Sequence, residues 1–173
     1  AASALVDQDS VSAGTQVTVT AWTVESANGE ESARVTKDLT LDVTPVLATT
    51  ANDNLIWDGD AINGRAGTDK VALRYGENVD HQDLATLLRN IEVLDLSVPG
   101  ANSITGGLSV SDVLAITGSD SGRLTIDGDA EDSVELASAD GWSTNGIVVD
   151  GHLVYTNTSS GVTLSIDEDI NVS

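Results

Sequence analysis

Short runs of alternating polar and apolar residues dominate this chain, and a period of two indicates β-strands. The clearest run is Gln16 to Val24, and Asn28-Gly29 predicts a hairpin turn to a return strand at 33–43. Seven more short strands are expected between Gly, Asn and Asp turns, at 70–74, 92–96, 123–126, 133–136, 147–149, 153–156 and 162–166. The pattern predicts an all-β fold, a β-sandwich or β-roll-like sheets, with one or two short helices.

Two segments depart from this alternation. Apolar residues from Leu84 to Ile91 follow helical spacing, with Asp80 as N-cap and Asp83 three residues later, so a short helix is expected there. Ser109 and Asp112 are spaced as a capping box before Val113 and Ile116. For this second segment, helix and strand remain equally open.

Pro45 marks the expected boundary between two modules. Residues 1–45 fit the end of an immunoglobulin-like β module or an N-terminal hairpin, and residues 46–173 fit a calcium-binding β domain. No apolar run approaches the 18 residues of a membrane span, and no signal peptide is recognisable at Ala1.

Charge narrows the expected partners. The chain has 28 acidic and 7 basic residues, a formal net charge of -21, and no cysteine. Nucleic acid and anionic membrane surfaces would be repelled, so neither nucleic-acid binding nor membrane insertion is expected. Divalent cations at carboxylate clusters would relieve the repulsion, whereas thiolate metal sites and disulfides are excluded.

The stretch from Asn52 to Leu73 is the strongest candidate for such a cation site. Glycines that expose carbonyl oxygens alternate there with carboxylates, and calcium prefers six to eight such hard oxygen ligands. The expected calcium ligands are Asp58, Asp60, Asn63, Gly64, Gly67 and Asp69. The alternative is a solvated loop between two strands.

A second candidate site has alternate aspartates across a glycine turn, where a cation would relieve the repulsion between carboxylates. Its members are Asp127, Asp129 and Asp132, and a solvated turn is again the alternative. No catalytic residue is predicted, because His81 and His152 lack metal-binding spacing and are expected to be ordinary surface or turn histidines.

Several segments, in this order, resemble the C-terminal region of large bacterial RTX adhesins exported by type I secretion. They are NGRAGTDKVAL, RNIEVLDLS, GANSITGGLSVSDVLAI, RLTIDGDAEDSVEL with the following DGW, and LVYTNTSSGVTLSIDEDINVS. The resemblance covers most of the chain after Asp53. Because the glycine-rich array is nearly absent, a compact sheet with one repeat-like loop is expected rather than a long parallel β-roll.

The resemblance implies a calcium-stabilised, non-catalytic module of a giant adhesin at the bacterial surface, secreted by type I machinery and serving attachment or biofilm formation. Val162 to Ser173 would carry the export signal, or else form a core strand. Two other functions stay open: a calcium-dependent module that binds a host or surface glycan or peptide, and the C-terminal appendage of a secreted enzyme.

Overall fold

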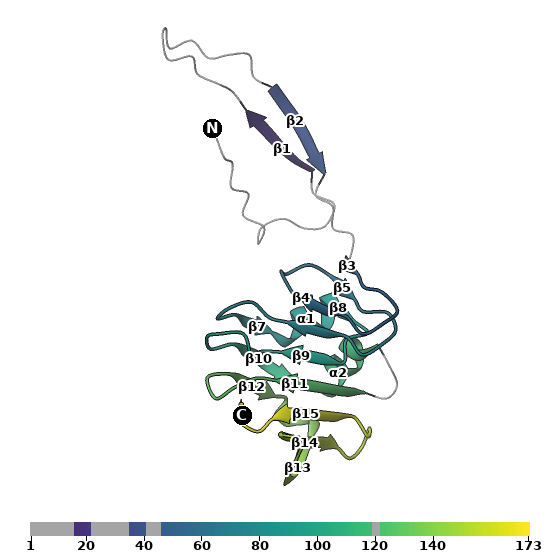
Figure 1. Ribbon diagram of the computed structural model, residues 1–173, viewed down its shortest axis with the longest axis vertical. Helices are drawn as coiled ribbons and strands as arrows, with labels where there is room; N and C mark the ends of the chain where they lie inside the picture. The colour runs from purple at the N-terminus through teal and green to yellow at the C-terminus, as the bar shows by residue number, and fades with distance from the viewer. Residues whose placement is uncertain (1–15, 22–34, 41–45, 119–121) are drawn as a thin grey trace. The chain divides into compact units, whose positions relative to one another are not determined.

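The computed structural model describes residues 16–21, 35–40, 46–118 and 122–173, and it divides the chain into compact units at 1–44 and 45–173 (Figure 1). In the first unit, β1 (Gln16–Ala21) and β2 (Val35–Thr40) pair antiparallel, which confirms the two strands expected there. The expected Asn28-Gly29 turn lies outside the described residues. Assignment of this unit to an immunoglobulin-like module stays a prediction.

The second unit is a short parallel solenoid, in which successive coils of the chain stack and pair strand on strand. Its long sheet has the order β4 (Asn54–Ile56), β6 (Lys70–Ala72), β9 (Val93–Asp95), β11 (Arg123–Asp127), β15 (Thr163–Asp167), β14 (His152–Asn157), β13 (Trp142–Val149). The second sheet has the order β7 (Asn78–Asp80), β10 (Ser103–Leu108), β12 (Ser133–Leu136), β16 (Asn171–Val172). The third sheet has the order β3 (Val46–Leu47), β5 (Ile62–Asn63), β8 (Leu88–Arg89). Strand pairs between successive coils are parallel. The antiparallel pairs in the described part of this unit are β13 with β14 and β14 with β15.

Two helices lie within coils of the solenoid. α1 (His81–Leu87) begins at the predicted N-cap Asp80, whose side chain accepts the N–H of Gln82. α2 (Val110–Thr117) begins with a full capping box between Ser109 and Asp112, which settles the second segment as a helix. A 3₁₀ turn, η2 (Ser138–Asp140), precedes β13. In the described part of the chain, no helix is long and apolar enough to cross a membrane.

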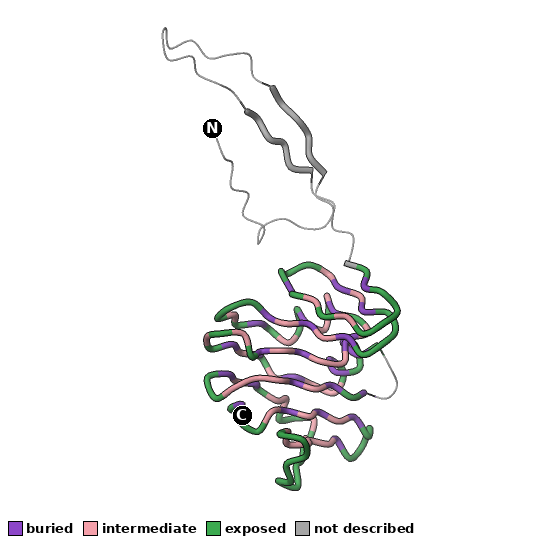
Figure 2. The backbone as a smooth tube through the Cα atoms, viewed as in Figure 1, coloured by how far each residue is buried: buried purple, intermediate pink, exposed green. Residues whose placement is uncertain are grey.

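Aliphatic residues fill the interior of the coils. In Figure 2 the buried residues recur as purple segments in successive coils. The register of the long sheet places one row across five coils: Leu55, Val71, Leu94, Ile126 and Ile166. The last four are fully buried. Each coil therefore covers the apolar face of its neighbour. A solenoid buries its core in this way, through contacts between adjacent coils.

This stacking confirms an all-β fold with short helices and changes the expected arrangement. The coils form a continuous parallel stack, not the compact sheet with one repeat-like loop expected from the sparse glycine repeat. The reason is that the stack is maintained by aliphatic rows and by polar residues at its corners, neither of which requires the glycine-rich repeat.

Candidate functional site

Polar residues at the corner where the chain enters the long sheet link one coil to the next. At this first corner, formed by Asp53, Asp69 and Glu92, each residue directly precedes a strand. The N–H of Asp53 donates to Asp69 Oδ1 at 2.9 Å, and the N–H of Asp69 donates to Glu92 Oε2 at 2.8 Å. The side chains of Asp69 and Glu92 thus each accept the backbone N–H of the equivalent residue in the preceding coil.

The same arrangement occurs at the second corner, formed by Glu77, Asn102 and Asp132, where the chain enters the second sheet. The N–H of Glu77 donates to Asn102 Oδ1 at 2.9 Å, and the N–H of Asn102 donates to Asp132 Oδ1 at 2.8 Å. Asp132 Oδ2 accepts the N–H of Asp129 at 2.8 Å. Asp132 is fully buried, and both of its oxygens have backbone donors.

Glycines of the two predicted sites allow these carboxylates to be buried. A Cβ at Gly64 would lie 2.2 Å from the carbonyl oxygen of Asn90 and 2.6 Å from Asp69 Oδ2. A Cβ at Gly128 would lie 2.8 Å from Asp132 Oδ2. At Gly64 the clash is with backbone, so only glycine fits there, whereas at Gly128 the side chains of Ile170 and Asp132 would have to shift. The Gly-to-Asp spacing that resembles a calcium repeat therefore also has a packing cause.

Asp69 differs from Asp132 in one respect. It is fully buried, yet its Oδ2 has no hydrogen-bond partner. Close by, burial raises the pKa of Glu92, and the charge of Asp69 contributes to the rise, while the hydrogen bond from the Asp69 N–H opposes it. An unpartnered buried carboxylate oxygen is costly, and a cation or an ordered water would relieve it.

The other residues of the first predicted site do not gather around Asp69. Asp58 and Asp60 are exposed, and Asp58 Oδ1 accepts the N–H of Asp60. Asn63 Oδ1 accepts from the N–H of Arg65 and from the side chain of Asn90. Gly67 has a φ of 134° and packs against the carbonyl of Ala51. Gly64 is the member of this set that packs closely against the Asp69 carboxylate.

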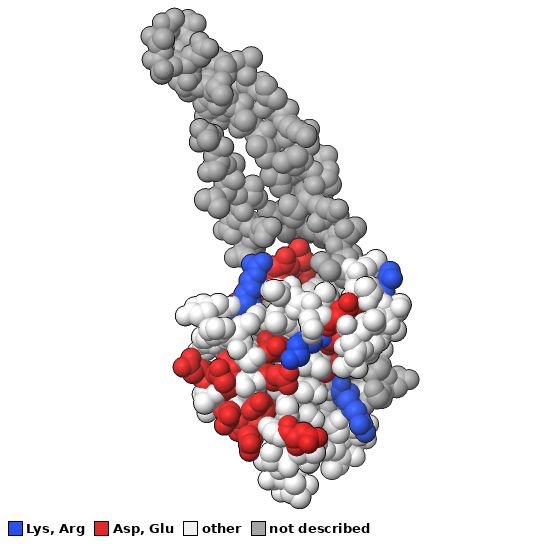
Figure 3. Space-filling model, viewed as in Figure 1, with Lys and Arg blue, Asp and Glu red and all other residues white. Residues whose placement is uncertain are grey.

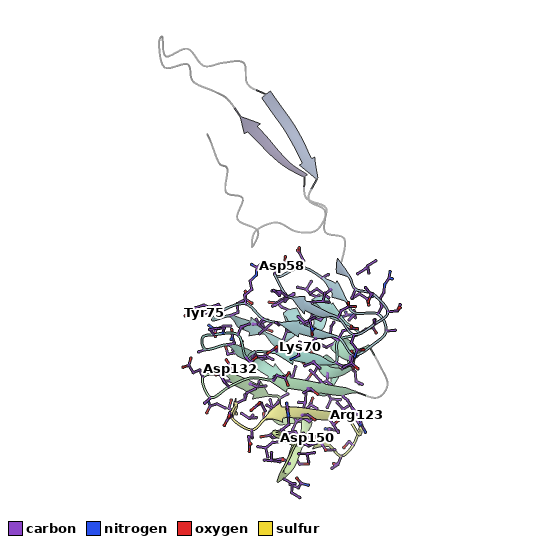
Figure 4. The ribbon with its side chains drawn as sticks, viewed as in Figure 1. Asp58, Lys70, Tyr75, Arg123, Asp132 and Asp150 are labelled. Carbon is purple, nitrogen blue, oxygen red and sulfur yellow. The ribbon has the colours of Figure 1, made fainter. Side chains whose placement is uncertain are left out.

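In the second predicted site, the Asp127 carboxylate has different partners from those of Asp129 and Asp132. Its Oδ2 pairs with Lys70 Nζ at 2.7 Å, and its Oδ1 lies 3.1 Å from His152 Nε2. Asp129 Oδ1 instead accepts the N–H of Glu131. The three aspartates therefore bind internal donors in different directions, and together they do not form a ligand cage. Asp58 and Asp132 also lie far apart, near different coils (Figure 4).

The Asp127 contacts belong to a charged network along the outer face of the long sheet. Lys70 also pairs with Asp95 Oδ2 at 3.2 Å, and the hydrogen bond to Asp127 raises the pKa of Lys70. Burial acts to raise the pKa of Asp95, but hydrogen bonds from Ser97 and Lys70 outweigh it, so that pKa is lowered. Lys70 and His152 thus bring positive charge to a face where like-charged aspartates stack.

We expect His152 to stabilise the fold more in mild acid than in mild alkali. Burial acts to lower its pKa, but hydrogen bonds to the Asp150 carbonyl and the Asp127 carboxylate raise it above its ordinary value. A raised pKa adds stability below the unfolded-state value, about 6.5, that is lost as pH rises through the folded-state value. The free energy of unfolding of wild type minus that of His152→Gln, measured in urea, should be larger at about pH 5.5 than at about pH 8. A difference independent of pH would contradict this assignment.

His81 is not the plain surface residue that the sequence predicts. Its Nδ1 lies 2.7 Å from Asp112 Oδ2, and both side chains are 13% exposed, so the pair joins α1 to α2. The hydroxyl of Ser109 donates to the same Asp112 oxygen at 2.5 Å. Because the hydroxyl contacts the carboxylate and not the imidazole, this trio lacks the hydroxyl-to-imidazole contact of a nucleophilic triad.

The corner residues, which link the coils by hydrogen bonds, are the feature of this region that the sequence analysis missed as a set. Across residues 46–118 and 122–173, no three His, Cys, Asp or Glu residues are grouped so that they could hold a metal ion. The sequence signal that could have identified them is their position, because an Asp, Glu or Asn directly precedes six strands. These residues are Asp53, Asp69, Glu77, Glu92, Asn102 and Asp132.

Comparisons of this chain with protein-family models, with curated protein sequences and with solved structures found no match.

Proposed function

We propose that this chain is a non-catalytic, calcium-stabilised module of a large bacterial surface adhesin, of the RTX type that its sequence resembles, and that it contributes to attachment and biofilm formation. Calcium ions and, during export, the type I secretion machinery are its proposed partners. The observation that carries the calcium part is the buried Asp69 Oδ2, which has no hydrogen-bond donor.

The donor set around Asp69 fits calcium in part. Asp69 Oδ2 and the carbonyl oxygen of Asn90 both lie against Gly64, and both are hard oxygen ligands of the kind that calcium prefers. Bound there, the ion would supply positive charge to an oxygen that the protein leaves unpaired. The trio Asp127, Asp129 and Asp132 does not fit, because five of its six carboxylate oxygens already have protein partners.

The surface charge supports the same proposal. Acidic side chains gather over part of the face drawn in Figure 3, with few Lys or Arg beside them, in a chain of net charge -21. Such repulsion weakens a compact state, and external divalent cations would reduce it. A stack of coils whose interior is filled with aliphatic side chains suits a structural role in an extended surface protein.

We expect calcium to raise the melting temperature of the full chain. Binding to the folded state alone adds about 2.7 kcal/mol at a hundredfold excess over Kd, or a shift on the order of 10 °C. Thermal unfolding followed by circular dichroism in millimolar CaCl₂ and in EGTA measures this shift. A shift below about two degrees, on the same scale, would reject calcium stabilisation.

A matched pair of variants locates the ion. Asp69→Asn should abolish most of the calcium-dependent shift, because it replaces the unpaired oxygen. Asp132→Asn changes an equally buried carboxylate whose oxygens have backbone donors, so it should lower stability in both media and keep the shift. Loss of the shift in Asp132→Asn alone would place the ion at the second corner.

A further inference from the structure

The edge strand β13 is unlike the other edges of the solenoid. The five other edge strands of its three sheets, β3, β4, β7, β8 and β16, have two or three residues each, whereas β13 has eight. Proteins limit unwanted pairing by keeping edges short or by placing charges on them. β13 is longer than these other edges and, from Trp142 to Val149, carries no charged residue.

The apolar end of β13 is exposed on both faces. Ile147, Val148 and Val149 are 60%, 41% and 53% exposed, and they are consecutive, so their side chains alternate between the two faces of the sheet. In Figure 2 this hairpin is green along β13, below the coils. Neither face of this segment is covered by the solenoid.

The backbone of this segment is also open. Asp150 and Gly151 have φ values of 51° and 81°, which fit a two-residue type I′ turn flanked by the hydrogen-bonded pair Val149 and His152. Val148 then lies opposite Leu153 in a pair without hydrogen bonds, so its N–H and C=O point away from β14. The bulge before it directs the N–H groups of Gly146 and Ile147 to the side chains of Thr144 and Asn145.

The acidic residues beside the β13–β14 turn favour a positively charged partner. Asp150 is exposed there, and the N–H of Glu168 donates to the carbonyl of Gly151, which places Glu168 beside the turn. A second copy of this chain, also at -21, would be repelled on approach. A segment with lysine or arginine at this end would be attracted.

We propose that Ile147 to Val149 of β13 bind an extended polypeptide segment by strand addition. The segment runs antiparallel to β13, has β-branched residues at its centre, and has lysine or arginine at its N-terminal end beside Asp150 and Glu168. Main-chain hydrogen bonds at Val148 give affinity, and the acidic pair gives orientation. This site goes beyond the proposed function, because it requires neither calcium nor export.

The test uses the full chain, labelled with ¹⁵N, and synthetic acetylated peptides of alternating threonine and valine. One peptide begins with two lysines, one ends with two lysines, and one begins with two glutamates. We expect the first to shift the amide resonances of β13 with the lowest Kd, and the glutamate peptide to bind about tenfold more weakly or worse. The absence of shifts in β13 up to the solubility limit, or equal binding of all three peptides, would overturn the proposal.

Val148→Pro removes the open-edge donor without breaking a β13–β14 hydrogen bond, and it should abolish binding, whereas the control Val148→Thr should retain it. Undiminished binding to Val148→Pro would overturn the proposal.

A second variant keeps the test decisive if Val148→Pro fails to fold. The double substitution Asp150→Asn with Glu168→Gln should remove the preference for the peptide that begins with two lysines. Asparagine tolerates the positive φ at position 150. Concentration-dependent shifts in β13 without peptide would identify a second copy as the occupant and would also overturn the proposal.

Discussion

A chain that ends after Gly161 should fail to fold its solenoid. Leu164 and Ile166 of β15 are fully buried, and β15 pairs with β11 on one side and β14 on the other. Each such side chain contributes about 2–3 kcal/mol through burial, and with Val162 and Ile170 the loss approaches the whole stability of a typical domain, about 5–15 kcal/mol. Urea unfolding followed by circular dichroism should show no cooperative transition, with calcium or without it.

The matched control removes only Asn171 to Ser173. β16 is a two-residue edge strand, so this shorter deletion should weaken the fold and keep a cooperative transition. A cooperative transition in the longer truncation would show that β15 is dispensable. The export role predicted for Val162 to Ser173 is a separate question. Fusing this segment to a carrier protein and measuring secretion tests it directly.

Replacing Asp132 with alanine should cost about 2–5 kcal/mol of unfolding free energy. The substitution leaves the N–H groups of Asn102 and Asp129 without their acceptor at a fully buried position. Asp129→Ala is the control, because Asp129 accepts only an exposed N–H within its own turn, and it should cost less than about 1 kcal/mol.

Urea unfolding of both variants in CaCl₂ and in EGTA separates hydrogen bonding from metal binding. If Asp132 acts by accepting backbone N–H groups, Asp132→Ala lowers the free energy of unfolding equally in both media. A loss confined to the calcium medium would instead identify Asp132 as a metal ligand, as the sequence pattern suggests.

Features set by neighbouring residues were predictable from the sequence. Asp80 was predicted as the N-cap of the first helix and is the N-cap of α1, because capping depends on side chains within one turn. The capping box at Ser109 and Asp112 was also visible in the sequence, but it left helix and strand equally open for α2. The strand at Ser133 to Leu136 was predicted with its observed bounds, because alternation is also local. Parallel stacking was not predictable, since its partners, such as Ile126 and Ile166, are far apart in sequence and share no turn signal.

The same limit applies to the candidate site. The sequence shows that aspartates alternate with glycines, but a carboxylate that faces a cation and one that faces a backbone N–H look alike in sequence. Asp132 receives its donor from Asn102, 30 residues away, and that contact exists only once the coils are stacked. Asp69 has the same kind of donor on one oxygen only.

The corner hydrogen bonds run in one direction, from an N–H of one coil to a side chain of the next. A duplicated coil inserted within this series would bring both an acceptor for the coil before it and a donor for the coil after it. The series ends where the register places Leu124 and Ile170 at the equivalent positions, and neither has a polar side chain. Internal gene duplication could therefore lengthen this domain among its early coils, while the later coils fix its end.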